Sequence, residues 1–243
     1  LRLGGVSVTG NAYVGGNVSN YGGGSLFGDI VAKGQIGLSR SFTVTGTSSS
    51  STSFGSIVNY DSLNNYFLST SRAIAAMDTT SVLTNQWGGI NLTASSGITV
   101  VSLSANELKN AWGFNITAPD DATIYINVTG ETASLDSTDW VYTGGVSSSN
   151  VLLNYLDATT LNLSGGNTVN ILAPYANTNF SYGVLTGTFI VGNLLGGGQV
   201  NVGHFQNADF TQGYPIPEPA SVLMVSIGGI LVGLGKKTGI FGK

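Results

Sequence analysis

The sequence contains no cysteine and few charged residues. Without cysteine the chain can form no disulfide, thiol nucleophile, Cys-ligated zinc site or iron–sulfur centre. Charged residues make up 8% of the chain, against about 25% in an average globular domain. The net charge of −4 without a basic patch excludes the electrostatic footprint of a nucleic-acid-binding protein.

Histidine is almost absent as well. A Ser-His-Asp triad would have to use His204, and no serine lies in a Gly-x-Ser-x-Gly turn. Asp136 and Asp139 could offer two oxygens to calcium, but calcium needs about six to eight ligands and the chain has no EF-hand loop. We therefore expect a non-enzymatic protein with no catalytic residues, no cofactor and no metal site.

The residues that are abundant indicate short strands and tight turns. The chain has 36 glycines, and pieces such as VSVTG, ATIYINVTG and GTFIVGNL alternate with Gly-rich or Asn-rich turns. Ile124, Ile126 and Val128 are two residues apart and are expected to face inward.

A short strand cannot bury its own apolar face, whereas stacked neighbours bury a continuous one. A β-sandwich fits this pattern too. The scarcity of long strands favours a mainly all-β fold, a right-handed parallel β-solenoid forming one domain over 1–212.

One segment has a helical period. Leu63, Phe67 and Ile74 recur at spacings of four and seven, which predicts a flanking amphipathic helix at about 62–77. Asp61 or Ser62 would cap its first turn.

The end of the chain changes character. We expect a Pro-rich linker at 213–219, then a hydrophobic helix at 220–243 with a basic end at Lys236 and Lys237. The apolar run would be about 24 Å long as a helix, whereas the bilayer core is about 30 Å thick. Three fates stay open for this helix: insertion in a membrane, removal by processing, or burial against a neighbouring subunit.

This ending resembles a known sorting signal. Pro217, Glu218 and Pro219 followed by an apolar segment and a basic end are similar to the PEP-CTERM signal of Gram-negative bacteria. The resemblance implies export and recognition of the Pro-Glu-Pro motif by an exosortase, a membrane protease-transpeptidase. The residues TGIFGK after the lysine pair depart from the usual Arg-rich end. Since no signal peptide precedes Leu1, we expect that a leader has been removed.

The rest of the chain resembles the choice-of-anchor A domain. The similarity is carried by GGNVSNYGGG, ANELKNAWGFNITAPDDATIYINVTG, LLNYLDATTLNLSGGNTVNILAP and FSYGVLTGTFIVGNLLGGGQVNVGHF. It covers most of residues 1–210 and implies a surface-displayed, non-enzymatic β-rich domain, sometimes described as adhesive. It implies no particular ligand.

Two functions follow as expectations. The first is an exported structural protein of the bacterial surface or biofilm matrix that self-assembles, even into filaments through its C-terminal helix, because neither end of the solenoid has an obvious polar cap. The second is an adhesin for matrix glycan, with an exposed subset of the aromatic residues stacking on sugars. Ice binding would need repeated Thr-x-Thr, and Thr43-Val44-Thr45 stands nearly alone. Asn-x-Ser/Thr triplets, including those at Asn91 and Asn115, are about as frequent as chance predicts.

Overall fold

The computed structural model describes residues 1–3, 6–20, 22–51, 58–201, 203–206, 222–226 and 229–233. The chain divides into two compact units where the sequence predicted one domain. One unit comprises Leu1–Asp61 with Thr211–Lys243, and the other comprises Ser62–Phe210. Parallel pairing dominates both, which confirms the mainly all-β, parallel β-solenoid fold class and excludes a sandwich of antiparallel sheets.

The first unit is a three-sided coil of short strands. Three coils of three strands are made by β1 (Arg2–Leu3), β2 (Val6–Thr9), β3 (Asn11–Val14), β4 (Val18–Asn20), β5 (Gly24–Phe27), β6 (Ile30–Ala32), β7 (Ile36–Gly37), β8 (Phe42–Val44) and β9 (Ser48–Ser50). Ala12 pairs with Ile30 and Ile30 pairs with Ser48, so a coil repeats after 18 residues. Small and branched side chains such as Ala12, Val14 and Leu26 fill its core.

One corner of this unit is held by side chains at the 18-residue step. Asn11 Oδ1 accepts the backbone N–H of Asp29 at 2.8 Å, and Asp29 Oδ1 accepts the N–H of Thr47 at 2.7 Å. Each side chain thus takes the place of a backbone acceptor where the strands turn.

The tail differs from the expected helix. Two antiparallel strands, β22 (Val222–Ser226) and β23 (Gly229–Gly233), occupy part of 220–243, and β22 pairs with β3. The helix prediction is wrong for these two segments, because Val and Ile favour strands and glycine disfavours helix. Within the part of the chain that is described, no helix is long and apolar enough to cross a bilayer.

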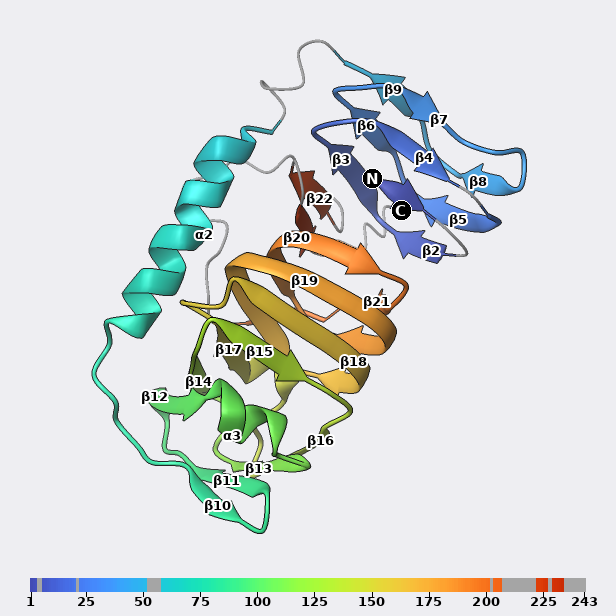
Figure 1. The fold of residues 1–243 in the computed structure, drawn as a ribbon. Helices are drawn as coiled ribbons and strands as arrows, with labels where there is room; N and C mark the ends of the chain where they lie inside the picture. The colour runs from blue at the N-terminus through green and yellow to red at the C-terminus, as the bar shows by residue number, and fades with distance from the viewer. Residues whose placement is uncertain are drawn as a thin grey trace, which may run out of the picture. The chain divides into compact units, whose positions relative to one another are not determined.

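The second unit is a larger solenoid with a helix beside it. Its elements are α2 (Tyr60–Ala75), β10 (Thr84–Gln86), β11 (Gly89–Thr93), β12 (Gly97–Ser104), α3 (Ala105–Lys109), β13 (Gly113–Thr117), β14 (Ala122–Thr129), β15 (Thr132–Leu135), β16 (Asp139–Thr143), the 3₁₀ turn η1 (Ser148–Asn150), β17 (Val151–Asn154), β18 (Thr160–Thr168), β19 (Asn170–Thr186), β20 (Phe189–Gly196) and β21 (Gln199–Asn201). Figure 1 shows β18, β19 and β20 stacked as successive turns. Strands β18 and β19 are long because each bends around a corner and contributes to more than one face.

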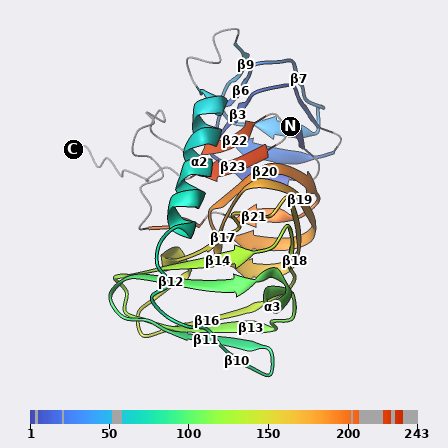
Figure 2. The same ribbon diagram turned by 60° about the vertical axis from the view of Figure 1, so that its left-hand side comes forward.

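Three faces of this unit are used below. The helix face contains β12, β14, β17 and the first residues of β19 and β20. The ladder face contains β15 and residues 160–163, 177–180 and 193–196. The tryptophan face contains β11, β13 and β16, with β10 along its edge (Figure 2). Ile124, Ile126 and Val128 point into the shared core, as predicted.

Helix α2 lies along the helix face. It begins and ends two residues before the predicted 62–77, and its apolar side buries Leu63, Phe67 and Ile74. Asn154 of β17 donates from Nδ2 to Ser71 O at 2.9 Å and to Asn127 Oδ1 at 2.8 Å. The face under the helix is therefore buried on both sides, which removes it from contact with a ligand.

The first coil of the second unit is covered at its edges. Strand β10 pairs with β11, and Thr80 N–H donates to Val100 O at 2.9 Å beside β12. Helix α3 follows β12 and starts with a capping box between Ser104 and Glu107. This end of the solenoid leaves few strand edges open for pairing.

Candidate ligand-binding face

The ladder face alternates buried apolar and outward polar residues. On β18, Leu161 and Leu163 are buried, whereas Thr160 and Asn162 point outward from the same strand. On β19, Asn177 and Asn179 are exposed on either side of the buried Thr178. The two-residue period of a strand thus places the polar side chains on the surface and the apolar ones in the core.

The outward residues form two columns across four strands. The in-register positions are Thr132, Thr160, Asn177 and Asn193 in one column and Ser134, Asn162, Asn179 and Leu195 in the other. Seven of these eight side chains are uncharged amides or hydroxyls, and none carries a charge. Neighbouring strands in a sheet lie about 4.8 Å apart, so each column presents a polar group at about that interval.

Two amides of the first column are hydrogen-bonded to each other and to the backbone. Asn193 Nδ2 donates to Asn177 Oδ1 at 2.8 Å, and Asn177 Nδ2 donates to Thr159 O at 3.4 Å. Such a chain fixes the amide orientation and presents donors and acceptors in a set order.

A buried asparagine holds the corner that leads into the helix face. Asn170 Nδ2 donates to Ser148 O at 2.7 Å and Val151 O at 2.9 Å, while its Oδ1 accepts the Thr188 N–H at 2.7 Å. At another corner, Gly183 has φ +110 and a Cβ there would lie 2.0 Å from Gly165 O. Only glycine allows the coils to approach that closely.

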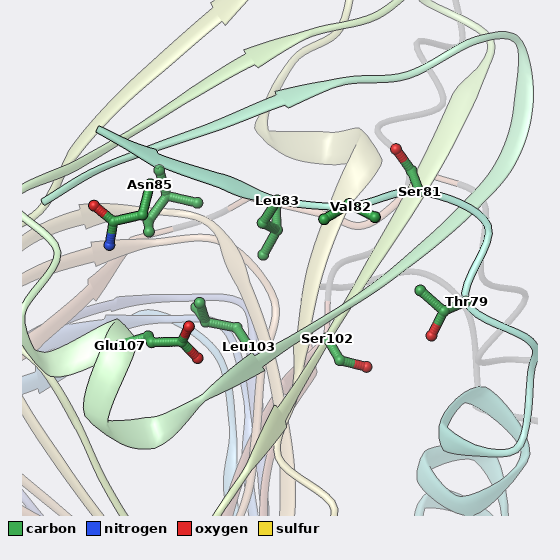
Figure 3. A pocket seen from close by; sticks show the side chains of 9 residues that line it. Thr79, Ser81, Val82, Leu83, Asn85, Ser102, Leu103 and Glu107 are labelled. Carbon is green, nitrogen blue, oxygen red and sulfur yellow. The ribbon is translucent and has the colours of Figure 1, made fainter. Parts of the chain in front are cut away.

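Two carboxylates that could have served a site, Glu107 and Asp136, make hydrogen bonds within the fold. A shallow pocket between 79–85 and β12 contains one carboxylate, Glu107 (Figure 3). Its oxygen accepts hydrogen bonds from Ser104 Oγ and Ser104 N–H, and these bonds lower the pKa of Glu107. Asp136 Oδ1 accepts Ser164 Oγ at 2.6 Å, and His204 is exposed. Among the described residues, no three acidic or histidine side chains lie close enough to hold a metal.

The sorting residues predicted from the sequence lie outside the described residues. This applies to Pro217, Glu218 and Pro219 and to the basic pair Lys236 and Lys237.

The sequence pattern did not reveal the residues of the ladder face, because these residues are far apart along the chain. Thr132 pairs with Thr160, Thr160 with Asn177 and Asn177 with Asn193, which are steps of 28, 17 and 16 residues. A search for local Thr-x-Thr cannot find columns of this kind. A weak signal existed in the short segments TAS, TLN and NTN, where polar residues alternate with an inward residue.

Comparison with known proteins assigns the chain to a family. A family model described as "Ice-binding-like adhesive domain" matches residues 3–202. The chain belongs to this family. The match runs through both units and includes every residue of the ladder face.

Two solved structures are similar to this adhesive-domain chain. One is the crystal structure of an ice-binding protein from the Antarctic ascomycete Antarctomyces psychrotrophicus, 16% identical over 81% of this chain and 94% of that chain, with a TM-score of 0.43. The other is an ice-binding protein from an Antarctic biological consortium, 16% identical over 79% and 83%, with a TM-score of 0.36. A search of curated proteins finds no match.

Proposed function

We propose that this chain is an exported, non-enzymatic surface adhesin whose ladder face binds an extended neutral polysaccharide. The observation that carries the proposal is the pair of columns, in which seven of eight side chains are uncharged amides or hydroxyls, on a parallel sheet. The family's description as an adhesive domain supports the same function.

The chemistry of the face suits hydroxyl-rich ligands. A sugar hydroxyl both donates and accepts, and an asparagine amide offers both functions on one side chain. A flat site of this kind makes many weak contacts, so affinity grows with the length of ligand that lies along the columns. The absence of charge in the two columns favours a neutral ligand over an acidic one.

Ice is the second candidate ligand, because the family description includes it. The mixture of Thr, Ser, Asn and one Leu in the columns gives unequal side-chain lengths. A crystalline surface requires a repeated identical spacing, whereas a flexible polysaccharide adapts to unequal lengths. The polysaccharide is therefore the stronger proposal.

Display at the cell surface is the second part of the proposal. The resemblance to the choice-of-anchor A domain and to the PEP-CTERM signal supports export in a Gram-negative bacterium, exosortase-type processing and at least transient membrane contact of the tail. Self-assembly into a biofilm filament has less support, since the first coil of the second unit is covered by β10, α3 and the segment around Thr80.

The test compares a double variant on β18 and β19 with a control variant on β19. Asn179→Lys, made together with Asn162→Lys, places two charged side chains on the ladder face, whereas Val184→Lys places one on β19 beyond the corner. Retention on cellulose and on dextran beads is measured for each, with adsorption to ice as a parallel assay. We expect the double variant to lose retention at least tenfold and Val184→Lys to bind as the unchanged chain. Equal retention of all three, or adsorption to ice without retention on either polysaccharide, would refute the proposal.

A further inference from the structure

The hairpin between β10 and β11 carries an exposed tryptophan in an unfavourable backbone conformation. Trp87 and Gly88 form its two-residue turn, with φ of +51 and +86. Two positive φ values define the type I′ turn, in which Asn-Gly is the preferred pair. Trp87 is 91% exposed and is the one non-glycine residue with positive φ in the described parts of the chain. A large ring held in this way, away from any core, points to a function for the ring.

A second tryptophan holds the turn in place. Trp112 Nε1–H donates to Trp87 O at 3.0 Å, and Asn85 Oδ1 accepts the Gly88 N–H at 2.9 Å. A Cβ on Gly89 would lie 2.7 Å from Trp112 Cζ2, so the Trp112 ring lies directly on the outward side of Gly89. Trp112 nevertheless stays 55% exposed. The Trp112 ring and the backbone of the Trp87–Gly88 turn are thus fixed at one end of the tryptophan face.

The surface that continues from the two rings is polar. Outward positions of β11 and β13 hold glycine, asparagine and threonine only. Asn115 Nδ2 donates to Asn91 Oδ1 at 3.0 Å, and Thr117 Oγ1 lies 2.8 Å from Thr143 Oγ1. On β16 the outward positions are Asp139, Val141 and Thr143, and Val141, which is 47% exposed, is the single aliphatic side chain at the outward positions of these three strands. One isolated aliphatic side chain is too little for an apolar patch that would bind a lipid or an apolar peptide.

We propose that Trp87 and Trp112 form a stacking subsite for a pyranose ring of a neutral glycan. A pyranose has an apolar face of C–H groups and a rim of hydroxyls. The indole rings would cover the face, and the Asn91–Asn115 amides would bind hydroxyls of the rim or of the next sugar. The subsite rests on the tryptophan pair and its polar border, and stands whether or not the ladder face binds a ligand. If both bind, one chain contacts glycan at two separate faces.

The experiment records NMR spectra and follows the three indole N–H signals while the protein is titrated with cellohexaose and, separately, with chitohexaose. The chain has three tryptophans, and the third, Trp140, is stacked on Phe114 with ring centroids 4.4 Å apart. We expect the signals of Trp87 and Trp112 to shift with one of the two hexasaccharides while that of Trp140 does not. Asn at the first position of a type I′ turn keeps the hairpin folded, so Trp87→Asn should weaken this binding about tenfold with an unchanged or higher melting temperature.

Three outcomes would overturn the subsite. One is no shift with either hexasaccharide. Another is a response to phosphatidylcholine vesicles in place of the sugars, which would indicate an interfacial role for the rings. The third is binding by Trp87→Asn within twofold of the unchanged chain. The Asn162→Lys, Asn179→Lys variant should keep the indole shifts, so failure at the ladder face and failure of this subsite are distinguishable.

Discussion

Ser71 on α2 donates from Oγ to Oδ1 of Asn154 on β17 at 2.6 Å, and both side chains are completely buried. Asn154 also donates to Ser71 O and to Asn127 Oδ1, so one amide joins the helix to two strands of the helix face. A buried polar group that loses its partner retains the cost of having left water. The contact therefore fixes the position of the helix along the sheet.

Replacing Asn154 with Ala should lower the free energy of unfolding by about 3 kcal/mol, because it leaves the Ser71 hydroxyl, Ser71 O and Asn127 Oδ1 without this partner. Urea denaturation followed by far-UV circular dichroism measures the change. Ser69→Ala is the control, since Ser69 Oγ donates only to Asn65 O on the exposed side of α2 and should change stability by less than about 0.5 kcal/mol. A similar small change in both variants would contradict the role of Asn154.

The hydroxyl of Tyr155 should be dispensable. Tyr155 is completely buried, and within the described residues its hydroxyl has no hydrogen-bond partner. Tyr155→Phe removes an unpaired polar atom and should leave stability unchanged or raise it by about 1 kcal/mol. Tyr155→Leu leaves a cavity and should cost about 2–4 kcal/mol. Thermal unfolding of the two variants tests this, and a loss above about 1 kcal/mol in Tyr155→Phe would show that the hydroxyl is bonded.

Stability should fall at alkaline pH. Burial raises the pKa values of Tyr142 and Tyr155 well above the usual value of 10.0. Both stay protonated in the folded chain, whereas in the unfolded chain they ionise near pH 10. The stabilisation is thus complete below about pH 10 and is lost as the pH rises further. Urea denaturation midpoints measured across this pH range give the decrease in stability with pH. This decrease should be smaller in Tyr155→Phe. A midpoint that does not change up to about pH 11 would contradict the burial of these groups.

The corner of the first unit should be sensitive to Asp29. Hydrogen bonds from the Thr47 N–H and then the Thr47 Oγ–H lower the pKa of Asp29 below its usual 3.8. The depressed pKa means that its contribution is present above about pH 4 and is lost as the pH falls through the folded-state value. Asp29→Ala should cost less than about 1 kcal/mol at neutral pH because the site is exposed, and Asp29→Asn should keep most of the contact. Loss of Thr47 amide protection from hydrogen exchange in Asp29→Ala, but not in Asp29→Asn, would identify the bond.

The parts of the fold that depend on local period were predictable. Inward residues of β14 and the apolar side of α2 follow from spacings of two and of three to four residues. The helix ends at Ala75, two residues before the predicted end, and Met77 beyond it is exposed.

The parts that depend on coil length were not predictable. The step between paired residues falls from 26 between Gly113 and Asp139 to 18 between Ile171 and Phe189, so the sequence shows no fixed repeat. Buried corner asparagines such as Asn150 and Asn170 look like ordinary turn residues, since only the neighbouring coil supplies their partners. The ladder columns and the Trp87–Trp112 pair share this origin, because their members meet only after the chain has turned a full coil.

The 18-residue step between Ile171 and Phe189 has an evolutionary consequence. Duplication of one coil inserts a complete turn, which adds one rung to each face and preserves the register of the coils on either side. The length of the ladder face can therefore change by whole coils through gain or loss of short gene segments. Such changes would leave the tryptophan pair at its own end of the solenoid untouched. Under the proposed function, relatives with different numbers of coils would differ in the length of polysaccharide that lies along the ladder face.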